Sequence, residues 1–320
     1  MKIHFMVRAA IALSFLSLPG LAQAPRAAHD HFNRGGSLYQ KGDFEGAIAD
    51  FTKAIEISSR LDNRSRSGDW KNKAGFAGAA SNFDDVKVLD PLAASAYANR
   101  GLARYQLGDY EGAIADCNRA ISINPRLSDG YNTRGLVRFI QKDYDGALLD
   151  FDRAIAISAR DPEVYNNRGN AYAEKNDLDR AIADFDRSIA LNPRLTAVYY
   201  NRGHARRRKD DADGAMKDFN KALTLDPRFA SGYYGRAVAL FDRNELDRAI
   251  NEFNRAIELD PRFALAYGNR GLTLLRQGKD AEAEKDFERV AALDPALRIE
   301  VELRIEKVKK WRQASRAGTN

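Results

Sequence analysis

Apolar and polar positions alternate along most of the chain with the spacing of amphipathic helices. Tyr165 and Tyr172 lie two turns apart on one side of a first helical pattern. A second pattern follows, in which Ala181 and Phe185 are one turn apart. Pro193 comes soon afterwards and stops this pattern, because proline cannot continue a helix and restricts the residue before it. This stretch therefore predicts two helices joined by a short turn.

The two-helix pattern recurs with a fixed period of 34 residues. A small residue stands at the same place in each copy, and a phenylalanine, replaced once by Cys117, follows it sixteen positions later. The small residues are Gly101, Gly135, Gly169, Gly203, Ala237 and Gly271, and the phenylalanines are Phe151, Phe185, Phe219, Phe253 and Phe287. Close approach of two helices at the small residue would let the phenylalanine fill the space between them. A period in this range indicates a solenoid of helical hairpins, in which neither helix can bury its apolar face alone.

Eight copies account for residues 28–297. The regular copies are 94–127, 128–161, 162–195, 196–229, 230–263 and 264–297, and a shorter copy covers 28–59. The segment 60–93 is diluted by glycine, but Trp70, Phe83 and Pro91 fall in register, so it is predicted to be an eroded repeat. The turn between the two helices of a copy is predicted at pairs such as Gly108–Asp109 and Lys142–Asp143.

These columns at a 34-residue period resemble the tetratricopeptide repeat (TPR) family. The resemblance covers residues 28–297 and implies an all-α fold, a right-handed α-solenoid superhelix of helical hairpins. Residues 298–320 are predicted to form a C-terminal capping helix and tail, because an apolar stripe at helical spacing continues after the last repeat. The stripe is Leu297, Val301, Ile305, Val308 and Trp311. Such a helix would cover the exposed face of the final repeat.

The N-terminal residues have the pattern of a bacterial secretory signal. Lys2 and Arg8 precede an apolar run from Ala9 to Leu18, and small residues follow. We expect residues 1–22 to be a signal peptide cleaved after Ala22, residues 23–27 to be a short linker, and the protein to be periplasmic or secreted. An uncleaved N-terminal anchor is the alternative.

A column of asparagines is the main candidate for a binding site. On a helix that advances about 100° per residue, the asparagine two positions before the small residue points away from the tyrosine and glycine positions. The resemblance to TPR proteins implies that first helices line a concave groove, where amides can bind an extended peptide. The predicted peptide-binding residues are Asn33, Asn99, Asn167, Asn170, Asn201, His204, Arg208 and Asn269. Solvation of the helix surface, or amide bonding between repeats, is the alternative role of the asparagine column.

A complete arginine column is predicted to have a structural role. An arginine precedes the small residue in every copy, and an acidic residue follows it sixteen positions later in all copies except the eroded one, as with Arg202 and Asp218. We expect these pairs to join first and second helices. The same pair repeats in every unit, which a single active site would not do.

Composition and charge exclude several classes of function. The chain has 51 Lys and Arg against 45 Asp and Glu, with both signs interspersed, so a nucleic-acid surface is not indicated. Cys117 is the only cysteine and histidine occurs four times, which leaves little material for a metal site or for catalysis. We therefore expect no catalytic residue, no cofactor, no metal and no membrane span after signal cleavage.

The sequence thus predicts a non-enzymatic scaffold that binds a protein or extended peptide in a concave groove. The alternative is a structural adaptor subunit of a secretion or enzyme assembly in the cell envelope, which would contact its partners through its outer surface. Neither the partner nor the oligomeric state follows from the residues.

Overall fold

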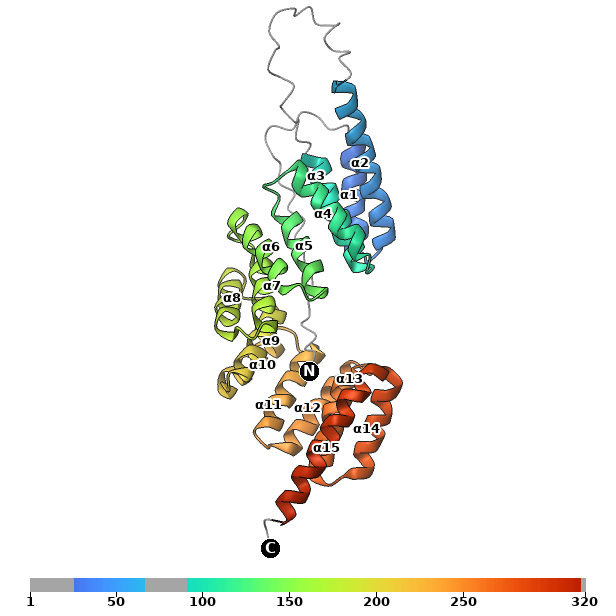
Figure 1. Cartoon of the computed structure of the whole chain (residues 1–320). Coiled ribbons are helices and arrows are strands. Elements are labelled where there is room, and N and C mark those ends of the chain that lie inside the picture. The colour runs from blue at the N-terminus through green and yellow to red at the C-terminus, as the bar shows by residue number, and fades with distance from the viewer. Residues whose placement is uncertain (1–25, 67–90, 318–320) are drawn as a thin grey trace, which may run out of the picture. The chain divides into compact units, whose positions relative to one another are not determined.

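The computed structural model describes residues 26–66 and 91–317, with side chains over 26–59 and 91–314 (Figure 1). The proposed signal peptide, most of the eroded repeat and the last three residues lie outside this part of the chain. The described residues form fifteen helices and no strand. They divide into two units, 26–175 and 176–317.

The first unit contains seven helices, and each of its second helices packs on the first helix that follows it. These are α1 (Arg26–Gln40), α2 (Phe44–Arg66), α3 (Pro91–Gln106), α4 (Tyr110–Ile123), α5 (Ser128–Ile140), α6 (Tyr144–Ile157) and α7 (Pro162–Glu174). The pairs α1/α2, α3/α4 and α5/α6 form hairpins, as the 34-residue period predicts.

The second unit contains eight helices that pack in the same manner. These are α8 (Leu178–Leu191), α9 (Thr196–Arg208), α10 (Ala212–Leu225), α11 (Ala230–Asp242), α12 (Leu246–Leu259), α13 (Ala264–Gln277), α14 (Asp280–Leu293) and α15 (Pro295–Ala317). The hairpins are α9/α10, α11/α12 and α13/α14, and α15 packs on both helices of the last one.

The small-residue and phenylalanine columns meet inside the hairpins. A Cβ atom built on Gly203 would lie 2.8 Å from the ring of Phe219, and one on Gly135 would lie 2.6 Å from Phe151. Both rings are completely buried. Because no larger side chain fits without moving the ring, glycine at this position sets the distance between the two helices of a hairpin, as the sequence predicts.

The turns inside the hairpins form at the predicted pairs. Gly108 and Lys142 have positive φ angles of 80° and 65°, which reverse the chain after the first helix. The aspartate that follows caps the second helix: Asp109 accepts a hydrogen bond from the backbone N–H of Gly112, and Asp143 accepts one from Gly146, both at 2.9 Å.

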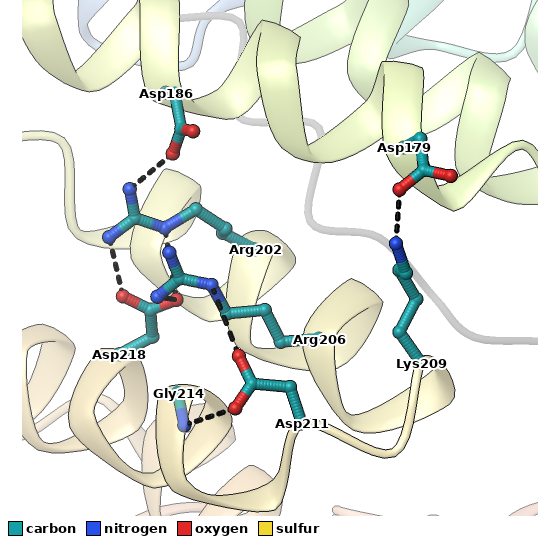
Figure 2. A network of polar contacts seen from close by, with 8 residues as sticks. All are labelled: Asp179, Asp186, Arg202, Arg206, Lys209, Asp211, Gly214 and Asp218. Carbon is teal, nitrogen blue, oxygen red and sulfur yellow. Dashed lines mark hydrogen bonds and ion pairs between the residues drawn. The ribbon is translucent and has the colours of Figure 1, made fainter.

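The arginine column joins helices of neighbouring repeats (Figure 2). Arg202 on α9 donates two hydrogen bonds to Asp218 on α10, at 2.9 and 2.6 Å, and a third to Asp186 on α8, at 2.6 Å. Arg206 reaches the same Asp218 carboxylate at 2.8 Å. The same two-carboxylate-oxygen contact recurs at Arg100, Arg134 and Arg270, each of which donates to both oxygens of one aspartate carboxylate. The predicted structural pairing of first and second helices is therefore confirmed.

The N-terminal hairpin packs directly on α3. Ala54 and Ile55 of α2 form a cluster with Ala96 of α3. Arg100 of α3 also donates to Thr52 of α2 at 2.9 Å, the bond that Arg134 makes to Asn118 one repeat later. The predicted eroded repeat, 60–93, falls between these two hairpins in the sequence. Its first residues belong to α2, which runs on to Arg66, and residues 67–90 lie outside the part of the chain that the structure describes.

The C-terminal helix begins at Pro295, three residues before the predicted start of the capping segment. Asp294 accepts hydrogen bonds from the backbone N–H groups of Ala296 and Leu297, each at 3.1 Å, and proline suits the first position of a helix. The predicted stripe faces the last hairpin, since Ile305 and Val308 pack with Leu274 and Leu275 of α13. No helix of the described residues is both long and apolar enough to span a membrane.

Candidate functional site

In the first unit, three of the four predicted groove residues are buried. Asn33 on α1 is exposed, whereas Asn99 on α3 and Asn167 on α7 are at most 8% exposed. The amide of Asn167 donates to the side-chain oxygen of Asn132 on α5 at 3.1 Å. Asn170 is completely buried, and its amide makes no hydrogen bond among the described residues.

In the second unit, the asparagine column is also buried. Asn201 on α9 is 0% exposed and Asn269 on α13 is 6% exposed. The Asn269 amide donates to the hydroxyl of Tyr234 on α11 at 3.0 Å and accepts from Arg304 on α15 at 2.8 Å. The sequence analysis did not single out Arg304, although it stands 34 residues after Arg270 in the arginine column.

The burial of these amides corrects the expectation that the asparagines point away from the core into solvent. A first helix packs on its own second helix and also on the first helices of the repeats before and after it. The side opposite the tyrosine is therefore covered by a neighbouring repeat. For Asn167 and Asn269 the structure shows the alternative role, amide bonding between repeats.

His204 is buried in an aromatic environment rather than on an open surface. Its ring lies 4.6 Å from that of Tyr200 and 5.4 Å from that of Phe219, measured between centroids. Neither ring nitrogen has a hydrogen-bond partner among the described residues. Burial, with the nearby charges of Arg207 and Arg208, lowers the pKa of His204 to about 3. The side chain is neutral at physiological pH and serves as a packing residue.

Arg208 is the predicted residue that lines an open cavity. The cavity has a volume of about 480 Å³ and lies at the C-terminal ends of α9 and α11, beside the first turn of α10. Its walls are Arg207, Arg208, Asp210, Ala212, Ala239, Asp242 and Arg243. The cavity is thus strongly polar, and three arginines face two aspartates.

Ion pairs hold most of these side chains in place. Arg207 on α9 contacts Asp242 on α11 at 2.7 Å, and Arg243 contacts Asp213 on α10. Arg208 donates to the side-chain oxygen of Asn176 at 3.0 Å. Of the residues in this cavity, sequence reasoning identified only Arg208. Asp242 stands 34 residues after Arg208, at the same position of the next repeat, and this spacing could have identified it.

The Cys117 thiol is shielded from solvent. Cys117 is completely buried, and burial raises the pKa of its thiol to about 12, so the reactive thiolate does not form at neutral pH. No cluster of three or more His, Cys, Asp or Glu side chains that could hold a metal occurs in the described part of the chain.

Models of the tetratricopeptide repeat match the sequence repeatedly. They cover residues 28–60, 94–127, 162–195, 196–229 and 264–297, and a further TPR model matches 135–175 and 238–278. The chain belongs to the tetratricopeptide repeat family. No curated protein matches the sequence.

Solved TPR structures have the same fold. A tetratricopeptide repeat protein from Parabacteroides merdae superimposes with a TM-score of 0.63 at 18% identity, covering 88% of this chain and 100% of that one. PilF of Pseudomonas aeruginosa gives 0.57 at 21% identity, covering 68% and 96%. The Cut9–Hcn1 hetero-tetramer of APC/C gives 0.60 at 14% identity, covering 87% and 55%. TPR proteins are in general scaffolds for protein interactions rather than enzymes.

Proposed function

We propose that this TPR protein is a non-enzymatic scaffold that binds an extended segment of a partner protein against the first helices of the 176–317 unit. The observation that supports this proposal is the open, arginine-lined cavity at the ends of α9 and α11. It is formed by first helices, which present the concave surface of a TPR hairpin array, and it contains the predicted binding residue Arg208.

The chemistry of the cavity favours a segment that carries an acidic side chain. Arginine presents several N–H donors in a planar arrangement that matches a carboxylate. Arg208 lines the cavity together with Arg207 and Arg243, so a carboxylate that entered it would meet three guanidinium groups. The Arg207–Asp242 and Arg243–Asp213 pairs would hold the walls in position.

We further propose that binding takes place outside the cytoplasm, after cleavage of residues 1–22. This proposal rests on the charged start and apolar run of the N-terminal sequence. Fractionation into cytoplasm and envelope, with the mass of the mature chain, tests it. A chain that begins at Gln23 in the periplasmic fraction supports export, and an intact N-terminus in the membrane fraction supports the anchor alternative.

In-cell photo-crosslinking tests the binding site. A photo-reactive residue at position 212, which lines the cavity and leaves Arg208 in place, should capture one or a few partner proteins, identified by mass spectrometry of the envelope fraction. The matched control carries the same residue at Leu149, which is 71% exposed on the second helix α6. Capture from 212 but not from 149 supports the proposal. Capture from 149 alone would contradict it and support an adaptor that binds through its outer surface.

Arg208→Glu provides the complementary loss-of-function test. Reversal of this charge should weaken partner binding by about tenfold or more, since it removes a charged donor and adds repulsion. The thermal midpoint should change little, because the side chain is only half-buried. Unchanged binding by a folded Arg208→Glu variant would rule out the cavity as the site.

A further inference from the structure

The C-terminal helix α15 follows the array through a shorter connection than the regular first helices do. Four residues, 260–263, separate α12 from α13, whereas Asp294 alone separates α14 from α15. Leu303 on α15 stands in the asparagine column, 34 residues after Asn269, but it is 65% exposed where Asn269 is 6% exposed. α15 therefore packs on the last hairpin with a different face from that of a regular first helix.

This packing leaves the last phenylalanine of the column partly open. Inside the array, Phe219 on α10 is completely buried, and a Cβ atom built on Gly235 of the following first helix would lie 2.6 Å from its ring. Gly235 and Leu303 occupy the same column, so Leu303 points to solvent where Gly235 closes over the ring. Phe287 on α14 is accordingly only half-buried.

A groove between α14 and α15 reaches the Phe287 ring. It consists of two adjoining cavities of about 150 and 370 Å³, which share Glu284, Phe287 and Ile305 as lining residues. The apolar part of the first cavity is formed by Phe287, Val290, Ala291, Val301 and Ile305. On α14 the lining extends from Asp280 to Ala291, about 16 Å or three turns of helix.

Acidic residues border this α14/α15 groove along α14. Asp280, Glu284 and Glu288 line it at four-residue spacing, which places them on one side of the helix, where like charges repel one another. Asp280 pairs with Arg312 of α15. Glu284 and Glu288 are exposed, and neither forms an ion pair with another side chain in the described part of the chain.

The basic side chains on the α15 wall are already neutralised. Arg298 pairs with Glu302 at 2.7 Å, and Lys309 pairs with Glu306 at 3.4 Å. The charge that remains unpaired along the groove is therefore negative, and a cationic partner would complement it.

The apolar lining favours a helix over an extended segment as the occupant. An extended segment would turn backbone N–H and C=O groups toward apolar side chains, which offer no hydrogen-bond partner. A helix satisfies its own backbone and presents side chains alone. Lysine or arginine residues four positions apart on that helix would lie about 6 Å apart along its axis, the spacing of Glu284 and Glu288.

We propose that the α14/α15 groove binds a cationic amphipathic helix of a partner protein. The apolar face of that helix packs on Phe287, Val301 and Ile305, and its lysine or arginine side chains pair with Glu284 and Glu288. The bound helix completes the burial of the last hairpin core, as a further repeat would. This site is separate from the arginine-lined cavity, which favours an acidic segment, and it does not depend on the function proposed for that cavity.

Selection from a displayed library of peptides of about 16 residues tests the groove without a known partner. The bait is the chain from residue 23, and peptides that also bind the variant Ala291→Arg are removed. Arginine at this position fills the groove while its charged end reaches water, so the variant should keep its helical circular dichroism and thermal midpoint. The retained peptides should carry apolar residues at helical spacing, flanked by lysine or arginine. Retention of acidic peptides, or of none, would overturn the proposal.

Fluorescence anisotropy with a labelled peptide from this selection tests the acidic residues. Glu284→Lys and Glu288→Lys should each weaken binding about threefold, and the double variant about tenfold. Glu282→Lys is the matched control, because it makes the same charge change at an exposed residue of α14 that does not line the groove, and it should weaken binding less than about twofold. Equal weakening by Glu282→Lys would show attraction to net charge alone and would contradict the proposal.

Two further measurements separate this site from the other surfaces of the chain. Arg208→Glu should bind the peptide at least as tightly as the wild type, so the groove and the arginine-lined cavity are tested independently. In sedimentation equilibrium without peptide, Ala291→Arg should behave as the wild type. Self-association of the wild type that Ala291→Arg abolishes would show that a second copy occupies the groove, and the proposal of a partner helix would be wrong.

Discussion

Asn269 joins three helices of its unit through a single side-chain amide. From α13 it donates to Tyr234 on α11 and accepts from Arg304 on α15. Replacement by alanine leaves the buried Tyr234 hydroxyl without its donor and removes the Arg304 acceptor. We expect Asn269→Ala to lower the free energy of unfolding by about 2 kcal/mol, measured by urea denaturation.

Asn33→Ala is the matched control for Asn269→Ala, because Asn33 belongs to the same column but is exposed on α1. Its effect should stay within about 0.5 kcal/mol. Equal losses from the two variants would show that burial does not decide the role of this column.

The asparagine column shows how far sequence reasoning reaches at the scale of a residue. Helical spacing correctly separated the hairpin core, where Phe219 lies, from the side that carries Asn201. It could not show that this other side is also covered. The first helix of a neighbouring repeat covers this side. Its burial therefore depends on how closely two helices pack, which the position of a residue around one helix does not reveal.

His204 should make the stability of the protein depend on pH. The folded-state pKa is lowered from 6.5 to about 3, so the unfolded chain binds one more proton than the native chain between these values. The free energy of unfolding contributed by this group therefore falls as pH falls below 6.5, by about 1.4 kcal/mol per pH unit.

The variant His204→Phe separates this contribution from that of the carboxylates. Its stability relative to the wild type should rise as pH is lowered from 7 toward 4, as measured by urea denaturation at a series of pH values. A difference between the two proteins that stays constant with pH would mean that His204 can be protonated in the folded state.

At the scale of the element, the α9/α10 hairpin is held by one arginine that contacts two carboxylates. Arg202 contacts Asp218, whose side chain is 4% exposed, and Asp186, whose side chain is 53% exposed (Figure 2). Asp218 also neutralises Arg206. Removal of Asp218 takes the buried carboxylate from both Arg202 and Arg206, whereas removal of Asp186 leaves Arg202 paired with Asp218.

Substitution of these two carboxylates should therefore have very different effects. We expect Asp218→Ala to cost about 3 kcal/mol of unfolding free energy, near the range for breaking a buried ion pair. Asp186→Ala should cost less than about 1 kcal/mol. Urea denaturation of the two variants under identical conditions checks this difference. Similar losses of unfolding free energy would show that the arginine column stabilises the hairpin through surface charge rather than through the buried Arg202–Asp218 ion pair.

At the scale of the whole molecule, the 34-residue period was sufficient to predict the hairpins, because turn, cap and core residues recur at fixed positions. It does not predict contacts that depart from the period. Arg100 on α3 donates to Thr52 on α2, 48 positions earlier, whereas the equivalent bond from Arg134 to Asn118 spans 16 positions. Sequence spacing does not report which surfaces of non-adjacent segments meet.

The C-terminal helix should stabilise the last hairpin far more than the repeats distant from it. In a repeat array, each unit contacts mainly its neighbours, so loss of one element affects the adjoining interface first. α15 covers Leu274 and Leu275 of α13, which a chain that ends at Asp294 would expose to water. We expect this truncation to lower the thermal midpoint of the protein.

Hydrogen exchange read by mass spectrometry locates that effect. Amides of α13 and α14 should exchange at least about tenfold faster in the truncated chain, which corresponds to a loss of about 1.4 kcal/mol of local stability. Amides of α3 to α6 should exchange as in the full chain, since these helices are many repeats away from α15 in the sequence and each repeat depends mainly on its neighbours. Uniformly faster exchange in all helices would instead mean that the array unfolds as one cooperative unit, and α15 would then contribute to the stability of every repeat.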